Sequence, residues 1–427
     1  MAAQQKKVAI LGGARIPFCR NNTAYADIGN REMGIKALGA TVERFGLQDQ
    51  EIGEVAFGAV IKHSRDWNLA REITLSSGLA PHTPGLTLQR ACGTSLDASI
   101  VIANKIAVGQ IDSGIAGGSD TTSDVPIVFK DAFARRLLDT NRARTFGDRL
   151  SAWKGFGFGE LAPALPGVSE PRTGKSMGDH CEIMAREWGI ERGAQDELAA
   201  ASHQNLAAAY DAGFMDDLVV PFRGLKRDGI LRPDTTVEKL STLKPAFDRR
   251  SGNGTLTAGN STPLTDGASC AMLANEAWAK KHKQEVLAYL VDAEVSAVDF
   301  VGGGEGLLMA PTYAVARLLK RNKLTFDDFD FFEIHEAFAA QVLCTLAAWE
   351  SSKYCKEKLK LRKALGSIDR EKLNVRGSSL AAGHPFAATG TRILPVAAKL
   401  LAEKGSGRCL ISICTAGGMG VAAIVER

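Results

Sequence analysis

The stretch Gly85-Leu-Thr-Leu-Gln-Arg-Ala-Cys92-Gly93-Thr94-Ser95 begins as a strand and continues into an apolar segment that ends at Val108. Residues 85–91 have the β-prone character of a short strand, and residues 93–108 have the length and apolar content of a buried helix. Another buried strand is predicted at residues 113–118. A strand, a helix and a second strand in succession are typical of layered α/β folds. Cys92 therefore falls at a strand-to-helix junction, near the N-terminus of the helix.

The same alternation of strands and helices predicts how the rest of the chain is organised. We assign residues 1–124 and 245–276 to one layered α/β/α half and residues 277–427 to a second, similar half. Residues 125–244 interrupt this pattern with an arginine-rich stretch, an irregular aromatic segment and two amphipathic helices, so we predict an inserted loop domain. The two halves share no repeated sequence strong enough to establish a duplication.

Composition narrows the classes of protein that the chain can represent. A length of 427 residues supports several cores, and 45% hydrophobic with 23% charged residues is ordinary for a globular protein. The net charge of +4 is too small to indicate a nucleic-acid partner. Eight cysteines without a C-x-x-C pair favour a reducing compartment. No signal-peptide core follows the N-terminal lysines, so we expect a cytoplasmic protein.

Cys92 is a candidate nucleophile that needs a base. A helix N-terminus stabilises a thiolate by about 0.3–1 kcal/mol, which is less than the ~1.36 kcal/mol of one pKa unit. The helix alone would leave the thiol protonated at neutral pH. We choose His384 as the base, because Gly383-His384-Pro385 is typical of a tight loop that reaches into a site. The alternatives are a buried, inert cysteine and a hydrogen-bonded loop histidine.

Two further residues complete the candidate chemistry. Cys414 precedes a glycine-rich run, residues 415–420, whose backbone N–H groups have the architecture of an oxyanion hole. His335 lies at a predicted strand-to-helix junction, where its side chain either points into a cleft or serves in the core. A metal site is disfavoured, because Cys409 and Cys414 have no matching pair of ligands nearby. Two thiols and an imidazole indicate covalent acyl chemistry on a thioester.

These motifs give the chain a resemblance to the thiolases over nearly its whole length, which implies the thiolase fold. The resemblance is carried by residues 91–95, 244–248, 257–268, 383–390 and 414–420, in this order.

His335 stands in His-Glu-Ala-Phe where commoner thiolases have an asparagine, and this form resembles the trifunctional-enzyme β-subunit branch. Arg376 and Ser378 also depart from the usual pattern, in a region that bears on fine substrate shape.

The resemblance implies a role for each catalytic candidate. Cys92 would attack the 3-keto carbon of a 3-ketoacyl-CoA while His384 accepts its proton. Cys414 would protonate the acetyl-CoA enolate and later deprotonate the incoming CoA. His335 and His384 would form one oxyanion hole, and the backbone N–H groups of Cys92 and Ala416 would form the other. Degradative thiolysis in fatty-acid β-oxidation is the implied activity.

The resemblance also implies the ligands and partners. CoA is a co-substrate, and neither a tightly bound cofactor nor a metal is expected. We expect a homodimer or homotetramer, with a hydratase/dehydrogenase α subunit as a possible partner. We interpret the aromatic segment 153–166 as a lid over the acyl tunnel, so membrane association is not expected. The positions that match the CoA-binding residues are Met177, Arg232, Leu243, Phe247, Ala258, Ser261 and Thr262.

Three alternatives remain open at this point. An acetyl-CoA acetyltransferase would run the same steps toward acetoacetyl-CoA. A decarboxylating ketoacyl synthase would use a cysteine with two histidines but would not need the thiol of Cys414. A non-catalytic acyl-CoA-binding or scaffold subunit would keep the fold without turnover.

Overall fold

The computed structural model describes residues 6–164 and 167–427. Residues 1–5, part of the N-terminus for which we predict no signal peptide, lie outside the described residues, as do residues 165–166 at the end of the aromatic segment. Within the described ranges, no helix combines the length and the apolar character that a membrane crossing requires.

Ten strands of the described chain form one mixed sheet. Its order is β10-β11-β12-β9-β1-β8-β5-β3-β4, and the short β2 pairs with β8. The bounds in chain order are β1 (Val8–Arg15), β2 (Cys19–Arg20), β3 (Glu54–Gly58), β4 (Gly85–Leu88), β5 (Ser113–Asp120), β8 (Thr265–Asn275), β9 (Ala288–Ala297), β10 (Phe331–Ile334), β11 (Arg408–Thr415) and β12 (Met419–Glu426).

The two parts of this sheet have the same topology. In the first part, β1 and β5 flank β8 in antiparallel fashion, and β3 runs parallel to β5. In the second part, β9 and β11 flank β12 in antiparallel fashion, and β10 runs parallel to β11. The parts join where residues 8–10 of β1 pair with residues 288–290 of β9. The strand order thus repeats although the sequence does not, which confirms the predicted α/β fold; the domain boundaries stay a prediction.

Two helices are buried between the halves of the sheet. These are α3 (Thr94–Ala107) and α14 (Thr389–Lys404), which share one core with inward-facing residues of both halves. They approach closely, because a Cβ on Gly390 would lie 2.2 Å from the backbone nitrogen of Leu96. Cys92 and His384 each lie just before one of these helices. The packing of α3 against α14 therefore brings together two residues that are far apart in sequence.

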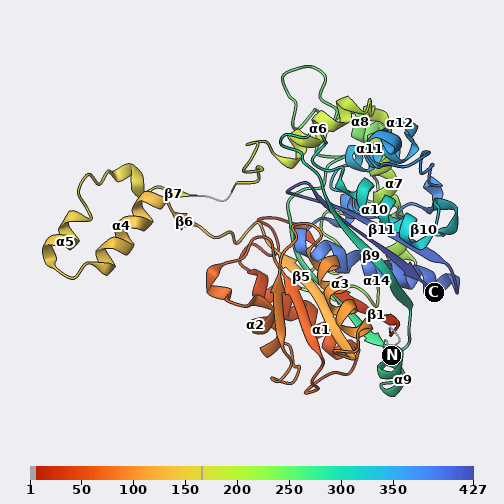
Figure 1. Ribbon diagram of the computed structural model, residues 1–427, viewed down its shortest axis with the longest axis horizontal. Helices are drawn as coiled ribbons and strands as arrows, with labels where there is room; N and C mark the ends of the chain where they lie inside the picture. Colours follow the sequence, from red (N-terminus) through yellow and green to blue (C-terminus); the bar gives the residue numbers. More distant parts are fainter. Residues whose placement is uncertain (1–5, 165–166) are drawn as a thin grey trace.

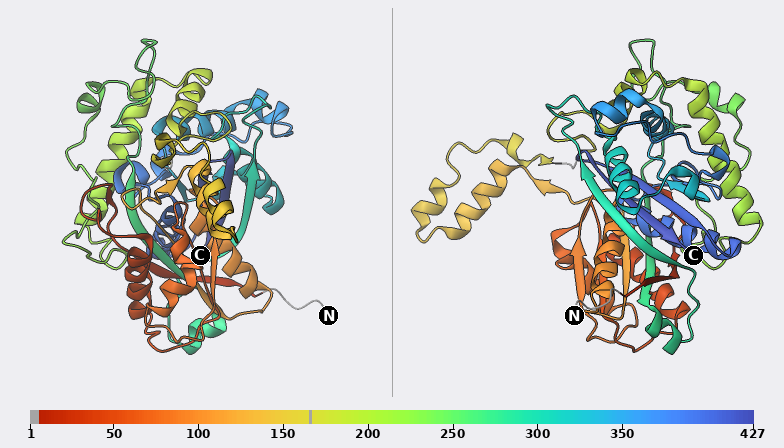
Figure 2. Two further views of the ribbon diagram at one scale, coloured as in Figure 1. Left: turned by 90° about the vertical axis from the view of Figure 1, so that its left-hand side faces the viewer. Right: turned by 45° about the vertical axis from the view of Figure 1, so that its right-hand side comes forward.

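Other helices cover the outer faces (Figures 1 and 2). α1 (Asn30–Arg44) and α2 (Leu69–Leu75) pack on the first half, and α10 (Ala310–Asn322) and α11 (Ala339–Glu350) pack on the second. The remaining short helices outside the insertion are η1 (Ser64–Asp66), α9 (Glu276–Lys281), η3 (Phe326–Asp328), α12 (Ser352–Glu357), η4 (Arg370–Lys372), α13 (Ser379–Ala382) and η5 (Phe386–Ala388).

The inserted region divides into two structurally different parts. The helices α6 (Met177–Glu187), α7 (Arg192–Asp211) and α8 (Val237–Ser241) lie beside the second half (Figure 1). The preceding segment forms an arm that projects away from the rest of the molecule (Figures 1 and 2). The arm consists of β6 (Val128–Phe129), α4 (Asp131–Arg142), α5 (Phe146–Ser151), η2 (Phe158–Leu161) and β7 (Pro163–Ala164).

The aromatic side chains of the arm pack mainly on one another. The ring centroids of Phe129 and Phe133 are 4.9 Å apart, and those of Trp153 and Phe156 are 5.4 Å apart. Phe146 and Phe158 remain exposed. The expectation that this segment is a lid is wrong for the described residues, because the arm points away from the body (Figure 1). Aromatic content alone does not specify which surface the rings cover.

Candidate active site

A tight turn between β4 and α3 presents the Cys92 thiol. Ala91 has a left-handed φ of 44°, which is uncommon for a residue with a side chain. The hydroxyl of Thr94 holds the turn, because it donates to the carbonyl of Ala91 at 2.6 Å and accepts from the backbone N–H of Arg90 at 2.8 Å. All eight cysteines lie within the described residues, and Cys92 is the one among them that is not fully buried. The strained Ala91 thus precedes the least buried cysteine, and such strain is common at functional sites.

His384 is fixed by hydroxyl groups on either side. Gly383 has a φ of 102°, which a side chain would strain. The backbone N–H of His384 donates to Thr265 Oγ1 at 2.7 Å, and its Nδ1 lies 2.5 Å from Thr389 Oγ1. The turn predicted from Gly-His-Pro therefore does direct the imidazole, and its Nε2 is buried without a partner among the described residues.

His335 follows β10 and is fully buried. Its backbone N–H donates to the carbonyl of Ser412 at 2.9 Å, which extends the pairing of β10 with β11. Its Nδ1 lies 2.7 Å from Ser379 Oγ, and in the described structure its Nε2 has no partner. The side chain is thus held from the Nδ1 side, while the opposite nitrogen is free for a ligand.

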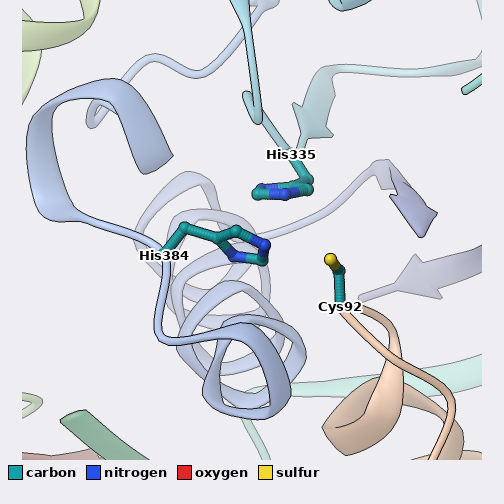
Figure 3. A group of neighbouring side chains, drawn as sticks. All are labelled: Cys92, His335 and His384. Carbon is teal, nitrogen blue, oxygen red and sulfur yellow. The ribbon is translucent and has the colours of Figure 1, made fainter. Parts of the chain in front are cut away.

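Cys92, His335 and His384 converge on one point (Figure 3). One ligand atom of each lies within 4.8 Å of the others, and the two imidazole centroids are 4.1 Å apart. Among the described residues this is the one cluster with the donor atoms of a metal site. The same arrangement places a nucleophile beside two buried nitrogens that lack hydrogen-bond partners.

The turn between β11 and β12 brings Cys414 and Ala416 to the same place. Cys414 is buried near the end of β11, and burial together with the nearby Cys92 raises its pKa well above the usual value. The backbone N–H of Ala416 faces the Cys92 sulfur and favours its thiolate. Gly417 and Gly418 form the turn with φ values of 76° and 68°. All five predicted catalytic residues therefore lie together.

Burial keeps these groups uncharged at rest. It raises the pKa of Cys92 to about 12, against the opposing effect of the Ala416 N–H. Burial, and then the charge of Arg392, lowers the pKa of His384 to about 3. Burial likewise lowers the pKa of His335 well below its usual value, with His384 and Arg392 as further causes. A neutral thiol beside two neutral imidazoles must therefore release its proton during attack.

The chain matches known protein families along almost its entire length. The family model described as "Thiolase, N-terminal domain" matches residues 8–277, and "Thiolase, C-terminal domain" matches residues 284–427. The chain belongs to the thiolase family. It is 39% identical to a 3-ketoacyl-CoA thiolase of Shewanella sediminis, with 99% of this chain and 98% of that protein covered. It is 40% identical to a 3-ketoacyl-CoA thiolase of Serratia proteamaculans, with 98% and 97% covered.

Two solved structures share the fold. The Bacillus anthracis acetyl-CoA acetyltransferase has a TM-score of 0.81 at 29% identity and covers 99% of both chains. Human mitochondrial 3-ketoacyl-CoA thiolase also has a TM-score of 0.81, at 27% identity, with 99% of this chain and 100% of that chain covered.

Several CoA-binding candidates of this thiolase gather around the segment that follows His335. Phe247 lies with its ring centroid 5.8 Å from that of Phe338, and Met177 belongs to the same apolar cluster. The backbone of Ser261 pairs with that of Phe338, and the Thr262 N–H donates to Ala337 O at 3.1 Å. The hydroxyl of Ser261 is buried and unpartnered in the described structure, so it is available to a ligand.

The remaining CoA-binding candidates are less closely grouped. Leu243 lies near the backbone that follows Ala258, because a Cβ on Gly259 would be 2.6 Å from the Leu243 side chain. Arg232 lies on a separate loop, where its backbone N–H donates to Nδ1 of His203 at 3.3 Å. Its predicted role toward the CoA phosphates stays a prediction.

Sequence reasoning missed the residues that position this thiolase site. Ser379, Thr389 and Arg392 hold the two histidines directly or through one another. Glu170 accepts a hydrogen bond from the Gly417 N–H at 2.6 Å, from a distant part of the insertion. Thr389 falls inside the recognised histidine motif, but the sequence carries no local signal for Glu170 or Ser379.

Proposed function

We propose that this thiolase cleaves 3-ketoacyl-CoA with CoA, giving acetyl-CoA and a shortened acyl-CoA through an acyl-Cys92 intermediate. One observation carries the proposal: a partly exposed thiol lies beside two buried imidazole nitrogens that have no hydrogen-bond partner among the described residues, and Cys414 is adjacent. The naming of its relatives as 3-ketoacyl-CoA thiolases supports the same reaction.

Carbon–carbon cleavage is the first half of the reaction. The Cys92 sulfur forms a bond to the 3-keto carbon while Nε2 of His384 takes the thiol proton. The bond between carbons 2 and 3 then breaks, and its electron pair passes to the acetyl-CoA enolate. Nε2–H groups of His335 and His384 stabilise the enolate oxygen, a type of contact worth about 2.7–4 kcal/mol of barrier. Cys414, kept protonated by burial, donates its proton to carbon.

Transfer of the acyl group to CoA is the second half. Cys414, now a thiolate, takes the proton of the incoming CoA thiol, a transfer that the raised pKa of Cys414 favours. The CoA sulfur attacks the acyl carbonyl, and the bond between the acyl carbon and Cys92 breaks. The backbone N–H groups of Cys92 and Ala416 stabilise the tetrahedral oxyanion, as their effect on the Cys92 thiolate supports. The Cys92 sulfur then regains its proton from His384.

Binding of CoA is assigned to the residues near Phe338 and to Arg232. Ser261 would hydrogen-bond an amide of the pantetheine arm with its unpartnered hydroxyl. Phe247, Met177 and Leu243 would provide apolar contact, and Ala258 and Thr262 would line the channel beside Ser261. The guanidinium of Arg232 would pair with a CoA phosphate.

Kinetics on a chain-length series tests the function. Purified protein is assayed with CoA and 3-ketoacyl-CoA esters from the four-carbon substrate upward, and acetyl-CoA condensation is measured in parallel. Cleavage of medium and long substrates supports the β-oxidation role. Activity confined to the four-carbon substrate would favour the acetyl-CoA acetyltransferase alternative, which the fold match to the Bacillus anthracis enzyme also suits. Absence of both reactions would support a non-catalytic subunit.

Assembly is a separate part of the proposal. We expect a homodimer or homotetramer, which light scattering on the purified protein measures. The histidine form of the His335 motif favours the trifunctional-enzyme β-subunit branch and hence a hydratase/dehydrogenase α subunit. Co-purification from the native host tests for that partner. If no such subunit co-purifies, the protein acts without it.

A further inference from the structure

A buried arginine is connected to His335 through one serine hydroxyl. Ser379, the first residue of α13, has its Oγ 2.7 Å from Nδ1 of His335 and 2.8 Å from Nη2 of Arg392. His335 and Ser379 are fully buried, and Arg392 is 4% exposed. Because water has almost no access, these groups must satisfy one another.

The available donors and acceptors determine the direction of both hydrogen bonds of Ser379 Oγ. A guanidinium only donates, so Ser379 Oγ accepts from Arg392. The serine has one hydrogen, and among its hydrogen bonds in the described structure the other partner is Nδ1 of His335. If Nδ1 carried a hydrogen, the serine hydrogen would be left buried without an acceptor. Nδ1 is therefore the acceptor, which leaves the imidazole hydrogen on Nε2.

We propose that Arg392, acting through Ser379, fixes His335 in the tautomer whose hydrogen is on Nε2, so that His335 is a permanent hydrogen-bond donor toward the Cys92 side of the site. Arg392 and Ser379 are positioning residues, since they act through His335. The identification of the recipient as a substrate oxyanion rests on the proposed thiolase function.

His384 has a different arrangement on its outer nitrogen. Its Nδ1 lies 2.5 Å from Thr389 Oγ1, and the hydrogen bonds of the described structure do not connect that hydroxyl to an arginine. Thr389 Oγ1 has no arginine donor, so unlike Ser379 Oγ it can either accept a hydrogen from Nδ1 or donate one to it. When it accepts, Nε2 of His384 has the lone pair that the Cys92 proton requires. The tautomer of His384 can therefore change during the reaction, whereas that of His335 is fixed.

The charge of Arg392 supports this assignment of tautomers. Its guanidinium lowers the pKa of both His335 and His384, after burial as the larger cause. Both rings therefore stay neutral, and a neutral ring has distinct tautomers that a hydrogen bond selects. Because the rings are neutral, the hydrogen bond from Ser379 determines which nitrogen of His335 carries the hydrogen.

Ser378 provides a matched control for Ser379. It is equally buried and accepts from the same Nη2 of Arg392 at 3.1 Å, but its own hydrogen is donated to the carbonyl of Ile334 at 3.2 Å. It therefore shares the burial and the arginine contact of Ser379 without a side-chain bond to His335.

Kinetics of the two serine variants give the first readout. We expect Ser379→Ala to lower kcat for cleavage about 10- to 100-fold with KM within about twofold, because an oriented donor is lost in the transition state. Ser378→Ala should keep kcat within about threefold of the parent value. Ser379→Thr, which retains a hydroxyl, should recover much of the lost kcat. Equal losses in both alanine variants at matched thermal stability, or kcat of Ser379→Ala within twofold of the parent, would overturn the proposal.

Histidine nitrogen NMR gives the second readout and does not depend on turnover. In ¹⁵N-histidine-labelled parent protein, the signals missing from His335→Asn identify His335, and we expect them to show a hydrogen on Nε2. In Ser379→Ala the Nε2–H signature should become mixed with the other tautomer. An Nδ1–H tautomer in the parent would overturn the relay even if thiolysis is robust. If the parent has no thiolase activity, the proposed function fails, and these shifts still decide the tautomer.

Discussion

The imidazole rings of His335 and His384 lie with centroids 4.1 Å apart and planes inclined by 44°. They come from different segments, one that follows β10 and one that precedes α14. Each ring is held at Nδ1 by a hydroxyl group, so both Nε2 atoms are left for the reacting molecule. The proposed function gives this pair hydrogen bonds to a developing negative charge, which neither loop could supply alone.

Substitutions of His335 separate its hydrogen-bonding role from its shape. His335→Ala should lower kcat for cleavage about 10²- to 10³-fold through loss of an oxyanion donor. His335→Asn retains an N–H donor, so its kcat for cleavage should fall by about tenfold or less. Steady-state kinetics with one 3-ketoacyl-CoA ester measure both variants. Equal activity of His335→Ala and the parent would remove His335 from the oxyanion hole.

Alkylation of Cys92 reports its ionisation in the free protein. Because its pKa is raised to about 12, the thiolate fraction should rise about tenfold per pH unit from roughly pH 7 to pH 10. The rate of carbamidomethylation by iodoacetamide should rise in parallel without a plateau. Cys92→Ser is the control for alkylation elsewhere. It should react little, because the other cysteines are buried. A plateau below about pH 8 would instead indicate a resting thiolate–imidazolium pair.

Glu170 connects the base of the arm to the Ala416 turn. Its carboxylate accepts from the Gly417 N–H at 2.6 Å, next to the N–H that faces Cys92. Glu170→Ala should lower kcat about tenfold, because small displacements of a catalytic donor are costly. Glu170→Gln retains an accepting oxygen and should keep most of the activity. Kinetics of the pair, at equal thermal stability, decide whether this hydrogen bond positions the turn.

Removal of the arm tests whether it participates in turnover. Phe129 pairs with Pro163, so residues 130–162 can be replaced by a two-residue Asn-Gly turn. Because the arm packs mainly on itself and projects away from the body, kcat should remain within about threefold and the unfolding midpoint within about 4 °C. A larger fall in activity with an intact fold would show that the arm reaches the site in solution.

The sequence identifies the candidate catalytic residues because each belongs to a local motif, and the structure brings these candidates together. Cys92 is identified by a strand-to-helix junction, and His384 and Cys414 by glycines that the structure places at left-handed φ. The layered fold is likewise evident from alternating strands and helices. Each of these features lies within a short segment of sequence, and the packing of α3 against α14 brings the segments together.

Features that depend on contacts between distant segments could not be predicted. Nothing near Ser379 or Glu170 indicates the hydrogen bonds that they form with His335 and Gly417. The interpretation of the aromatic segment as a lid is wrong, because its composition does not reveal that the rings pack within a projecting arm. Arg376, which departs from the usual thiolase pattern, lies over the ring of Phe214 and near Glu403.

Trapping of the acyl-enzyme tests the central claim most directly. Protein is incubated with acetoacetyl-CoA without free CoA, quenched in acid and digested, and the peptides are examined by mass spectrometry. We predict an acetyl group on the peptide that contains Cys92, its removal when CoA is added before the quench, and its absence in Cys92→Ala, which should also lose at least about 10³-fold in cleavage rate. An unmodified Cys92 peptide during active turnover, or undiminished cleavage by Cys92→Ala, would contradict the account.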